Sequence, residues 1–343
     1  MMSRMRSALL AGLCLAAAPF ALAAPARSAG NPTDKVLDVD CDRACLQAAL
    51  ENVLAAIAAK DITNLPLGND VRSTQNGVEI RLDDGIWQTV SAIGKYRLFA
   101  IDPVSGQAGV YTTMTQGAKQ LLVAVRIGTW EQKIHEIEFV IAAGAGGPGG
   151  SSPGDGVEKQ GRPRPQFLRT VPAKERMSRA DLIRTANSYF STLAGSTGKY
   201  IAPFAPTCHR LENGFATTNN KSNVRLGEAN RNGPNMIAMG CEEQWKTGFF
   251  RFVTGIRDRR FPIVDEERGI VMAFGFFDHS GTIREMKLGT GETIEATLKN
   301  PATWLISEAF QINKGKLDQI EAVLEAVPYK MRNAVWTEGD HIP

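Results

Sequence analysis

The sequence has little net charge and few histidines, and both scarcities exclude classes of function. Its 343 residues include 39 lysines and arginines against 36 aspartates and glutamates, and a net charge of +3 is too small to indicate nucleic acid as a partner. The four histidines are scattered, so we expect no metal centre built from them and no cofactor. With 43% hydrophobic and 22% charged residues, the composition is that of a globular protein rather than a disordered chain.

The first residues have the pattern of a secretory signal peptide. Two arginines precede an apolar run over residues 8–20, and Ala21-Leu22-Ala23 offers a cleavage site of small residues. The run is shorter than the roughly 18–20 residues that a membrane span needs, and no later stretch is long enough. We therefore expect residues 1–23 to be removed and the protein to be exported. The destination is periplasmic or extracellular, and the alanine-rich leader favours the periplasm.

Cysteines are also scarce, and their number favours disulfides. Four cysteines follow the leader: Cys41, Cys45, Cys208 and Cys241. An even number in an oxidising compartment indicates disulfides rather than thiol chemistry. We predict one bond between Cys41 and Cys45 at a helix start and one between Cys208 and Cys241 that closes a long loop. A catalytic Cys208 beside His209 is the alternative.

A glycine- and proline-rich stretch divides the chain. Residues 143–166 contain almost nothing apolar, which predicts a flexible linker over 143–170. This stretch contains a dinucleotide-binding glycine pattern and a nucleophile-elbow pattern, but neither has the strand and helix that such motifs require. We therefore expect one domain over 24–142 and a second over 171–343.

The two sides of the linker repeat one another. Apolar residues at helical spacing recur 136 positions apart, at Leu46, Leu50, Val53 and Ile57 and at Leu182, Ala186, Tyr189 and Leu193. Asn76-Gly77 and Asn213-Gly214, a pair typical of tight hairpin turns, follow at an offset of 137. Asp102 then matches Asp265 at 163, and Glu138 matches Glu321 at 183. This order indicates two copies of one fold.

Each copy is predicted to be α+β, with a helix followed by a meander of long antiparallel strands. We expect strands near 95–101, 108–115, 120–127 and 134–141 in the first copy and near 259–264, 270–277, 304–312 and 316–324 in the second. The growing offset places two insertions in the second copy, one before Asp265 and one around Ser280–Pro301. Such loops usually carry the specific function of a scaffold, so we expect the second copy to be functional.

The chain resembles the nuclear transport factor 2-like superfamily, whose members include SnoaL-like polyketide cyclases, ketosteroid isomerase and scytalone dehydratase. The helix stripe, the Asn-Gly turn and the Lys-x-x-x-Ile-Glu closing strand carry this likeness. The chain is still more similar to a tandem family of secreted fungal and bacterial proteins, on the strings Cys41-Asp-Arg-Ala-Cys45-Leu, Glu212-Asn-Gly214, Val264-Asp-Glu-Glu-Arg-Gly269, Phe277-Asp-His279 and Ile320-Glu-Ala-Val323. The resemblance implies two tandem cone-shaped barrels, each with N-terminal helices packed on a curved antiparallel sheet.

In relatives of this fold the pocket is the open mouth of the cone, where a shielded carboxylate or histidine acts as a general base without a cofactor. Leu317, Gln319, Glu321 and Val323 are expected to share one face of the last strand. Glu321 is our first candidate base, because apolar neighbours raise the pKa of a carboxyl. A structural ion pair with Arg257 or Arg260 is the alternative, and the matching Glu138 favours it.

Further candidates lie near the expected mouth. Asp278 and His279 end an otherwise apolar strand beside the second insertion, and His279 could exchange a proton near neutral pH. Tyr329, in the tail after the last strand, could donate a hydrogen bond over the mouth. The candidate substrate-binding residues are Arg257, Arg260, Glu212 and Asn213.

Together these features predict an exported, cofactor-independent proton-transfer enzyme (a lyase, dehydratase or isomerase) acting on a small organic molecule in the second domain. A small-ligand-binding module and a protein-interaction module, through intramolecular domain pairing or a homo-oligomer, remain alternatives. The enzyme requires an enclosed pocket in the second copy with at least two convergent ionisable groups. A binding module predicts an apolar pocket with donors only, and an interaction module predicts a filled cone with a broad exposed apolar face.

Overall fold

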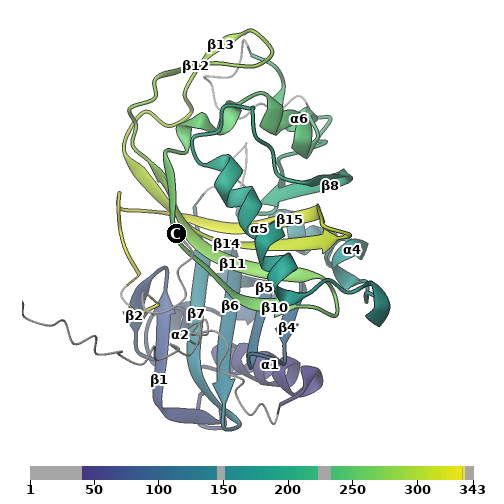
Figure 1. The fold of residues 1–343 in the computed structure, drawn as a ribbon. Coiled ribbons are helices and arrows are strands. Elements are labelled where there is room, and N and C mark those ends of the chain that lie inside the picture. The colour runs from purple at the N-terminus through teal and green to yellow at the C-terminus, as the bar shows by residue number, and fades with distance from the viewer. Residues whose placement is uncertain (1–40, 145–150, 223–232, 334, 337–343) are drawn as a thin grey trace, which may run out of the picture.

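The computed structural model describes residues 41–144, 151–222, 233–333 and 335–336, so the expected signal peptide lies outside the described residues. The fold is mixed α+β, with two large open sheets and few helices (Figure 1). Each sheet carries one long helix on one face, and the two sheets pack against each other through their other faces. None of the described helices is long and apolar enough to cross a membrane.

The first body contains α1 (Arg43–Ala59), β1 (Leu67–Gln75), β2 (Val78–Ile80), α2 (Ile86–Thr89), β3 (Ala92–Ile93), β4 (Leu98–Asp102), β5 (Gln107–Gln116), β6 (Lys119–Trp130) and β7 (Lys133–Ala142). Its sheet has the order β2-β1-β7-β6-β5-β3, with β4 also paired to β5. β1 runs parallel to β7, while the other neighbours are antiparallel.

The second body contains α5 (Arg179–Leu193), β8 (Phe204–Glu212), β9 (Phe215–Ala216), η4 (Met236–Ala238), α6 (Cys241–Lys246), η5 (Phe249–Phe252), β10 (Gly255–Asp265), β11 (Ile270–His279), β12 (Glu285–Lys287), β13 (Thr293–Glu295), β14 (Ala302–Asn313) and β15 (Lys316–Val327). Its main sheet has the order β10-β11-β14-β15-β8-β9. β8 runs parallel to β15, as β1 does to β7. The predicted repeat is therefore present in the topology.

Each long helix starts at a capping side chain, and the predicted Asn-Gly turns are confirmed. The Asp42 carboxylate accepts from the backbone N–H of Cys45 at 2.9 Å, and the Ser178 hydroxyl accepts from that of Asp181 at 3.2 Å. These caps satisfy backbone donors that have no partner within a helix. Asn76 and Asn213 have positive φ angles of 48° and 47°, each followed by a glycine with positive φ, as a tight hairpin requires.

The segment between the bodies differs from the flexible linker expected over 143–170. Where it is described, it forms α3 (Asp155–Gln160) and α4 (Pro165–Leu168), followed by η2 (Ala173–Glu175). Val157 and Phe167 are buried in the core between the two sheets. Two apolar side chains therefore anchor a segment whose composition alone indicated no packing.

A reciprocal pair of aspartates joins the two bodies. Asp102, at the end of β4, accepts from the backbone N–H of Val264 at 2.9 Å and pairs with the arginine that begins α5 at 2.6 Å. Asp265, at the end of β10, accepts from the backbone N–H of Ile101 at 3.0 Å and pairs with the arginine that begins α1 at 2.6 Å. Because equivalent residues exchange equivalent contacts, the two bodies form an internal, two-fold-like pair.

Candidate functional site

A cavity of about 110 Å³ lies in the second body between α5, the main sheet and the two inserted segments. It is lined by Tyr189, Leu193, Arg210, Glu212, Phe249, Phe250, Phe252, Val253, Phe277, Thr297, Trp304, Ile306, Glu308, Ala322 and Leu324. The residues of η5 come from the first insertion and Thr297 from the second. Since an apolar cavity of about 150 Å³ holds benzene, this space suits a molecule with one small ring or less.

The cavity wall is aromatic, but three of its buried side chains are polar. Arg210 and Glu308 are 1% and 2% exposed, and Tyr189 is also buried. The charges of Glu308 and Arg210 shift the pKa of Tyr189 in opposite directions, so its hydroxyl lies close to both side chains. Tyr189 is therefore near a carboxyl and a guanidinium in the wall of one cavity.

Arg210 is held rigidly. Its Nε donates to the Thr217 hydroxyl at 3.0 Å and lies 3.0 Å from a Glu212 carboxylate oxygen. The guanidinium carbon also lies 4.8 Å from the centre of the Phe250 ring and 5.4 Å from that of Trp245. These aromatic faces stabilise a buried cation that water does not reach.

Two buried polar atoms of residues that line this cavity have no hydrogen-bond partner among the described residues. They are Nη1 of Arg210, a donor, and Oε2 of Glu308. A buried polar atom without a partner costs roughly 1–3 kcal/mol, and native proteins contain few. An unmatched donor and an unmatched carboxyl oxygen in one aromatic cavity therefore indicate a place for a polar group of a ligand.

The Glu308 carboxyl titrates near neutrality. Burial and the charge of Glu212 raise its pKa to about 8, against the opposing effects of Arg210 and the Tyr189 hydrogen bond. Burial also raises the pKa of Tyr189 well above its ordinary value. Glu308 can thus take up or release a proton at physiological pH, while Tyr189 stays protonated.

The first body has none of these polar groups at the equivalent positions. In the shared register Val125 matches Glu308, Ser73 matches Arg210, and the helix stripe matches Val53 to Tyr189. Val125 and Val53 belong to the apolar core under α1. The polar cavity is therefore specific to the second body.

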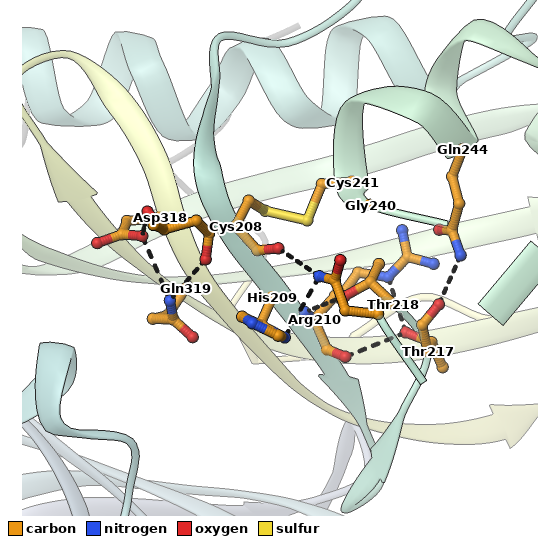
Figure 2. Close-up of a disulfide and its surroundings, with 12 residues drawn as sticks. Cys208, His209, Arg210, Thr217, Thr218, Gly240, Cys241, Gln244, Asp318 and Gln319 are labelled. Atoms are coloured by element: carbon orange, nitrogen blue, oxygen red, sulfur yellow. Dashed lines mark hydrogen bonds between the residues drawn. A yellow bond between two sulfur atoms is a disulfide. The ribbon is translucent and has the colours of Figure 1, made fainter. Parts of the chain in front are cut away.

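The disulfide Cys208–Cys241 lies beside this cavity and is confirmed, as is Cys41–Cys45. Figure 2 shows it joining β8, two residues before Arg210, to the start of α6. Within the same helix, the Gln244 side-chain amide donates to the backbone carbonyl of Thr217, whose hydroxyl holds Arg210. The bond therefore fixes the elements that position Arg210.

Glu321 lies on the opposite face of the sheet from the cavity. Its two carboxylate oxygens accept from the Tyr96 hydroxyl of the first body at 2.8 Å, and burial raises its pKa to about 7. Glu321 shares its face with Val323, but Leu317 lies on the other face, in the core under α5. The pairing of β15 with β14 shifts by one residue at Asp318. This shift places Leu317 on the sheet face opposite to the one expected from simple alternation.

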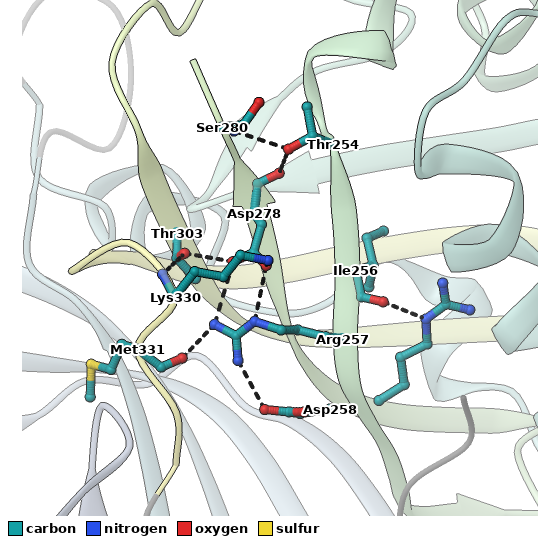
Figure 3. A network of polar contacts seen from close by, with 10 residues as sticks. Thr254, Ile256, Arg257, Asp258, Asp278, Ser280, Thr303, Lys330 and Met331 are labelled. Carbon is teal, nitrogen blue, oxygen red and sulfur yellow. Dashed lines mark hydrogen bonds and ion pairs between the residues drawn. The ribbon is translucent and has the colours of Figure 1, made fainter. Parts of the chain in front are cut away.

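The alternative considered for Glu321, a structural ion pair with Arg257 or Arg260, is wrong. Arg260 instead donates to Glu138 at 2.6 Å, across the interface between the bodies. Arg257 donates to Asp278 at 3.0 Å, and Lys330 donates to the same carboxylate at 2.7 Å (Figure 3). Arg257, Asp278 and Lys330 thus join β10, β11 and the C-terminal tail, and none of the three lines the cavity.

His279 and Tyr329 do not meet Glu321. The His279 ring is fully buried between Phe252 and Trp304, next to two residues of the cavity wall, and burial lowers its pKa to about 4. Tyr329 is 40% exposed in the tail. His279 therefore lies behind two side chains of the cavity wall, whereas Tyr329 does not line the cavity.

Of the four expected substrate-binding residues, only Glu212 lines the cavity. The Asn213 side chain instead donates to the backbone carbonyl of Leu324 at 2.9 Å and accepts from its N–H at 2.9 Å. Asn76 makes the same two bonds to Ile141 in the first body, so this asparagine holds the turn to its sheet.

Sequence reasoning missed Arg210 and Glu308 and assigned Tyr189 only to a helix stripe. A signal for Glu308 was present, because the offset of 183 aligns it with Val125, an apolar position of the twin. An acid that replaces valine at a core-facing strand position indicates function or a partner. No comparable signal marked Arg210, because its equivalent in the first copy, Ser73, is found only with the offset of 137 that the two Asn-Gly turns define.

Comparison with known families relates the second body to one of them. The family described as Domain of unknown function (DUF8021) is similar to this chain over residues 175–324. That segment includes every residue that lines the cavity. No curated protein matches the chain.

Proposed function

We propose that the protein is an exported, cofactor-independent enzyme that moves a proton on a small carbonyl compound in the second body. The observation that carries this proposal is that two residues lining one largely aromatic cavity, Arg210 and Glu308, each keep a buried polar atom without a partner, Nη1 and Oε2 respectively, among the described residues. Lyase, dehydratase and isomerase reactions all contain such a step.

The chemistry follows from the roles that these side chains can take. The ionised Glu308 carboxylate removes a proton from the carbon next to the carbonyl group. Arg210 donates to the carbonyl oxygen and stabilises the negative charge that develops there. The Glu308 carboxyl then exchanges its proton with solvent and protonates the same carbon, which gives exchange, or it protonates a more distant carbon of the conjugated enolate, which gives isomerisation. Protonation of a hydroxyl on the neighbouring carbon instead releases water and gives dehydration. The Tyr189 hydroxyl orients the carboxyl throughout.

Two further parts of this proposal concern the fold and the location. The long helix, the parallel first and last strands and the curved antiparallel meander support a nuclear transport factor 2-like, SnoaL-like architecture for each body, with the cavity at the cone of the second. The two disulfides support export to an oxidising compartment. A purely binding role is less favoured, because a cavity for binding alone needs no carboxyl that titrates near pH 8.

Proton exchange tests the proposal without knowledge of the natural substrate. The protein is incubated in D₂O with acetone, butanone and acetophenone, and deuterium uptake next to the carbonyl is followed by NMR. We expect at least one compound to exchange faster than in buffer. Glu308→Gln should lose roughly 10²–10⁴-fold in rate, the usual contribution of a general base.

Glu321→Gln is the matched control. Glu321 is as buried as Glu308 and its pKa is also raised, but it faces the first body rather than the cavity. We expect its exchange rate to equal that of the wild type. Loss of exchange in Glu321→Gln with full activity in Glu308→Gln would contradict the proposal, as would the absence of exchange with every compound.

A further inference from the structure

One position explains why the second body has a cavity where the first has a filled core. Ala322 pairs with Glu212 and Glu308 on the neighbouring strands, and Phe139 occupies the corresponding place between Gln75 and Val125. The backbone N–H of the turn asparagine donates to the carbonyl of each, at 2.9 Å in both bodies. Ala322 and Phe139 are therefore equivalent.

Phe139 shows what this place accepts. Its ring is fully buried in the core under α1 and meets the indole of Trp87 edge to face, with centroids 5.7 Å apart. In the second body the alanine leaves this space empty, and the wall around it is built from phenylalanine and tryptophan side chains. Such walls favour a flat ring in offset or edge-on contact.

We propose that the ligand of the second body carries a single six-membered planar ring, which occupies the place that the Phe139 ring fills in the first body, and that Ala322 determines this specificity by admitting it. This inference rests on the proposed function for the polar end of the ligand, and it names the substrate class as single-ring aromatic carbonyl compounds. A cavity of about 110 Å³ is close in size to the cavity of roughly 150 Å³ that holds benzene, and it is not larger, so we expect it to take one ring rather than two fused rings.

Benzene tests the ring site separately from the chemistry, because it has no carbonyl group. Binding to the full chain is measured by calorimetry and by saturation-transfer NMR, with naphthalene as the oversized probe. We expect the wild type to bind benzene and not naphthalene. Ala322→Phe should lose at least about tenfold in affinity, since one methylene in an apolar pocket is already worth roughly 10–200-fold.

Two further variants keep the test decisive. Ala58→Phe adds the same ring at an exposed position of α1 in the first body and should leave benzene binding unchanged. Ala322→Val gives a smaller, graded loss of affinity, and it replaces Ala322→Phe if that variant does not fold. The first body already folds with phenylalanine at this register position, which supports Ala322→Phe as a folded variant.

The outcomes separate the two proposals. No benzene binding by the wild type, equal binding of naphthalene, or unchanged binding in folded Ala322→Phe would each overturn the ring site. Benzene binding without deuterium exchange in any ketone would leave the ring site standing and overturn the proton-transfer function. Exchange of acetone without benzene binding would do the reverse.

Discussion

At the scale of single residues, Glu308 and Glu321 show how the two faces of one sheet give the same side chain different surroundings. Both are buried, and burial raises the pKa of both, to about 8 and about 7. Glu321 is satisfied by the Tyr96 hydroxyl of the first body, whereas Glu308 keeps one oxygen without a partner in the cavity. A raised pKa alone therefore does not distinguish the two acids, and our proposal of Glu308 as the base depends on its unmatched oxygen and its place in the cavity wall.

The pH dependence of exchange should report Glu308. The base is the ionised carboxylate, and with a pKa of about 8 most of it is protonated at neutral pH. We expect the exchange rate at acetophenone concentrations far below saturation to rise roughly tenfold per pH unit below pH 8 and to level off above it. A profile that levels off near pH 5 would assign the base to a carboxyl of ordinary pKa and contradict the role of Glu308.

The free energy of unfolding should decrease as the pH rises, whereas the exchange rate should increase. In the unfolded chain both carboxyls have pKa values near 4.5, whereas in the folded protein the values are about 8 and about 7. The folded state therefore binds more protons, and the stability present below pH 4.5 is lost as the pH rises through about 7 and then 8. Urea unfolding should give a smaller free energy at about pH 9 than at about pH 5, and Glu308→Gln should reduce this difference. An unchanged difference in that variant would show that Glu308 does not contribute.

At the scale of elements, the disulfide Cys208–Cys241 joins β8 to α6 over a sequence separation of 33, whereas Cys41–Cys45 spans only 4. Closing the longer loop restricts the unfolded chain more, so its loss should cost about 4 kcal/mol against about 2 kcal/mol for the shorter one. Urea unfolding of the two double cysteine-to-serine variants measures both values. Equal costs would contradict the loop-closure explanation.

The same variants test whether α6 positions Arg210. Because Trp245 of α6 stacks on the Arg210 guanidinium, loss of Cys208–Cys241 should also slow deuterium exchange into acetophenone. Loss of Cys41–Cys45, at the start of α1 in the first body, should leave that rate unchanged. Equal exchange rates in both variants would show that α6 holds Arg210 without the disulfide.

Regular elements were predictable from sequence because their causes are local. The stripes of α1 and α5, their caps and the two Asn-Gly turns each depend on residues a few positions apart. The long strands were found for the same reason. The face of Leu317 was not, because it depends on a register shift with the neighbouring strand. The packing of α3 and α4 was not predicted either, because it depends on contacts with sheets that are distant in sequence rather than on composition.

The candidate site could be predicted only in part, for a reason that also concerns distance. The second copy and its insertions were expected to carry function, and the cavity is lined by both insertions. The choice between Glu308 and Glu321 depended on which face of the sheet meets the first body. That choice follows from the pairing of two bodies, which no local pattern in either copy contains.

At the scale of the whole molecule, each sheet packs one face against its long helix and the other face against the sheet of the other body. The two sheet faces that do not contact a long helix form a single core, which includes Tyr111, Met272, Phe274 and Leu305. A sheet with both faces covered buries more apolar surface than one exposed to water, and this burial is the main driving force for association. The first body therefore covers the sheet whose other face forms the cavity.

Buried charges cross this interface at Glu138, which accepts from Arg126 of its own body at 2.7 Å and from Arg260 of the second body at 2.6 Å. Glu138→Gln should remove about 3–5 kcal/mol of stability, because the buried Arg260 guanidinium loses its counter-charge and Arg126 keeps only Glu136. Glu321→Gln should cost far less, since the Tyr96 hydroxyl can donate equally to an amide oxygen. Thermal melts of both variants make the comparison. Equal losses would mean that the interface depends on general burial rather than on the charge of Glu138.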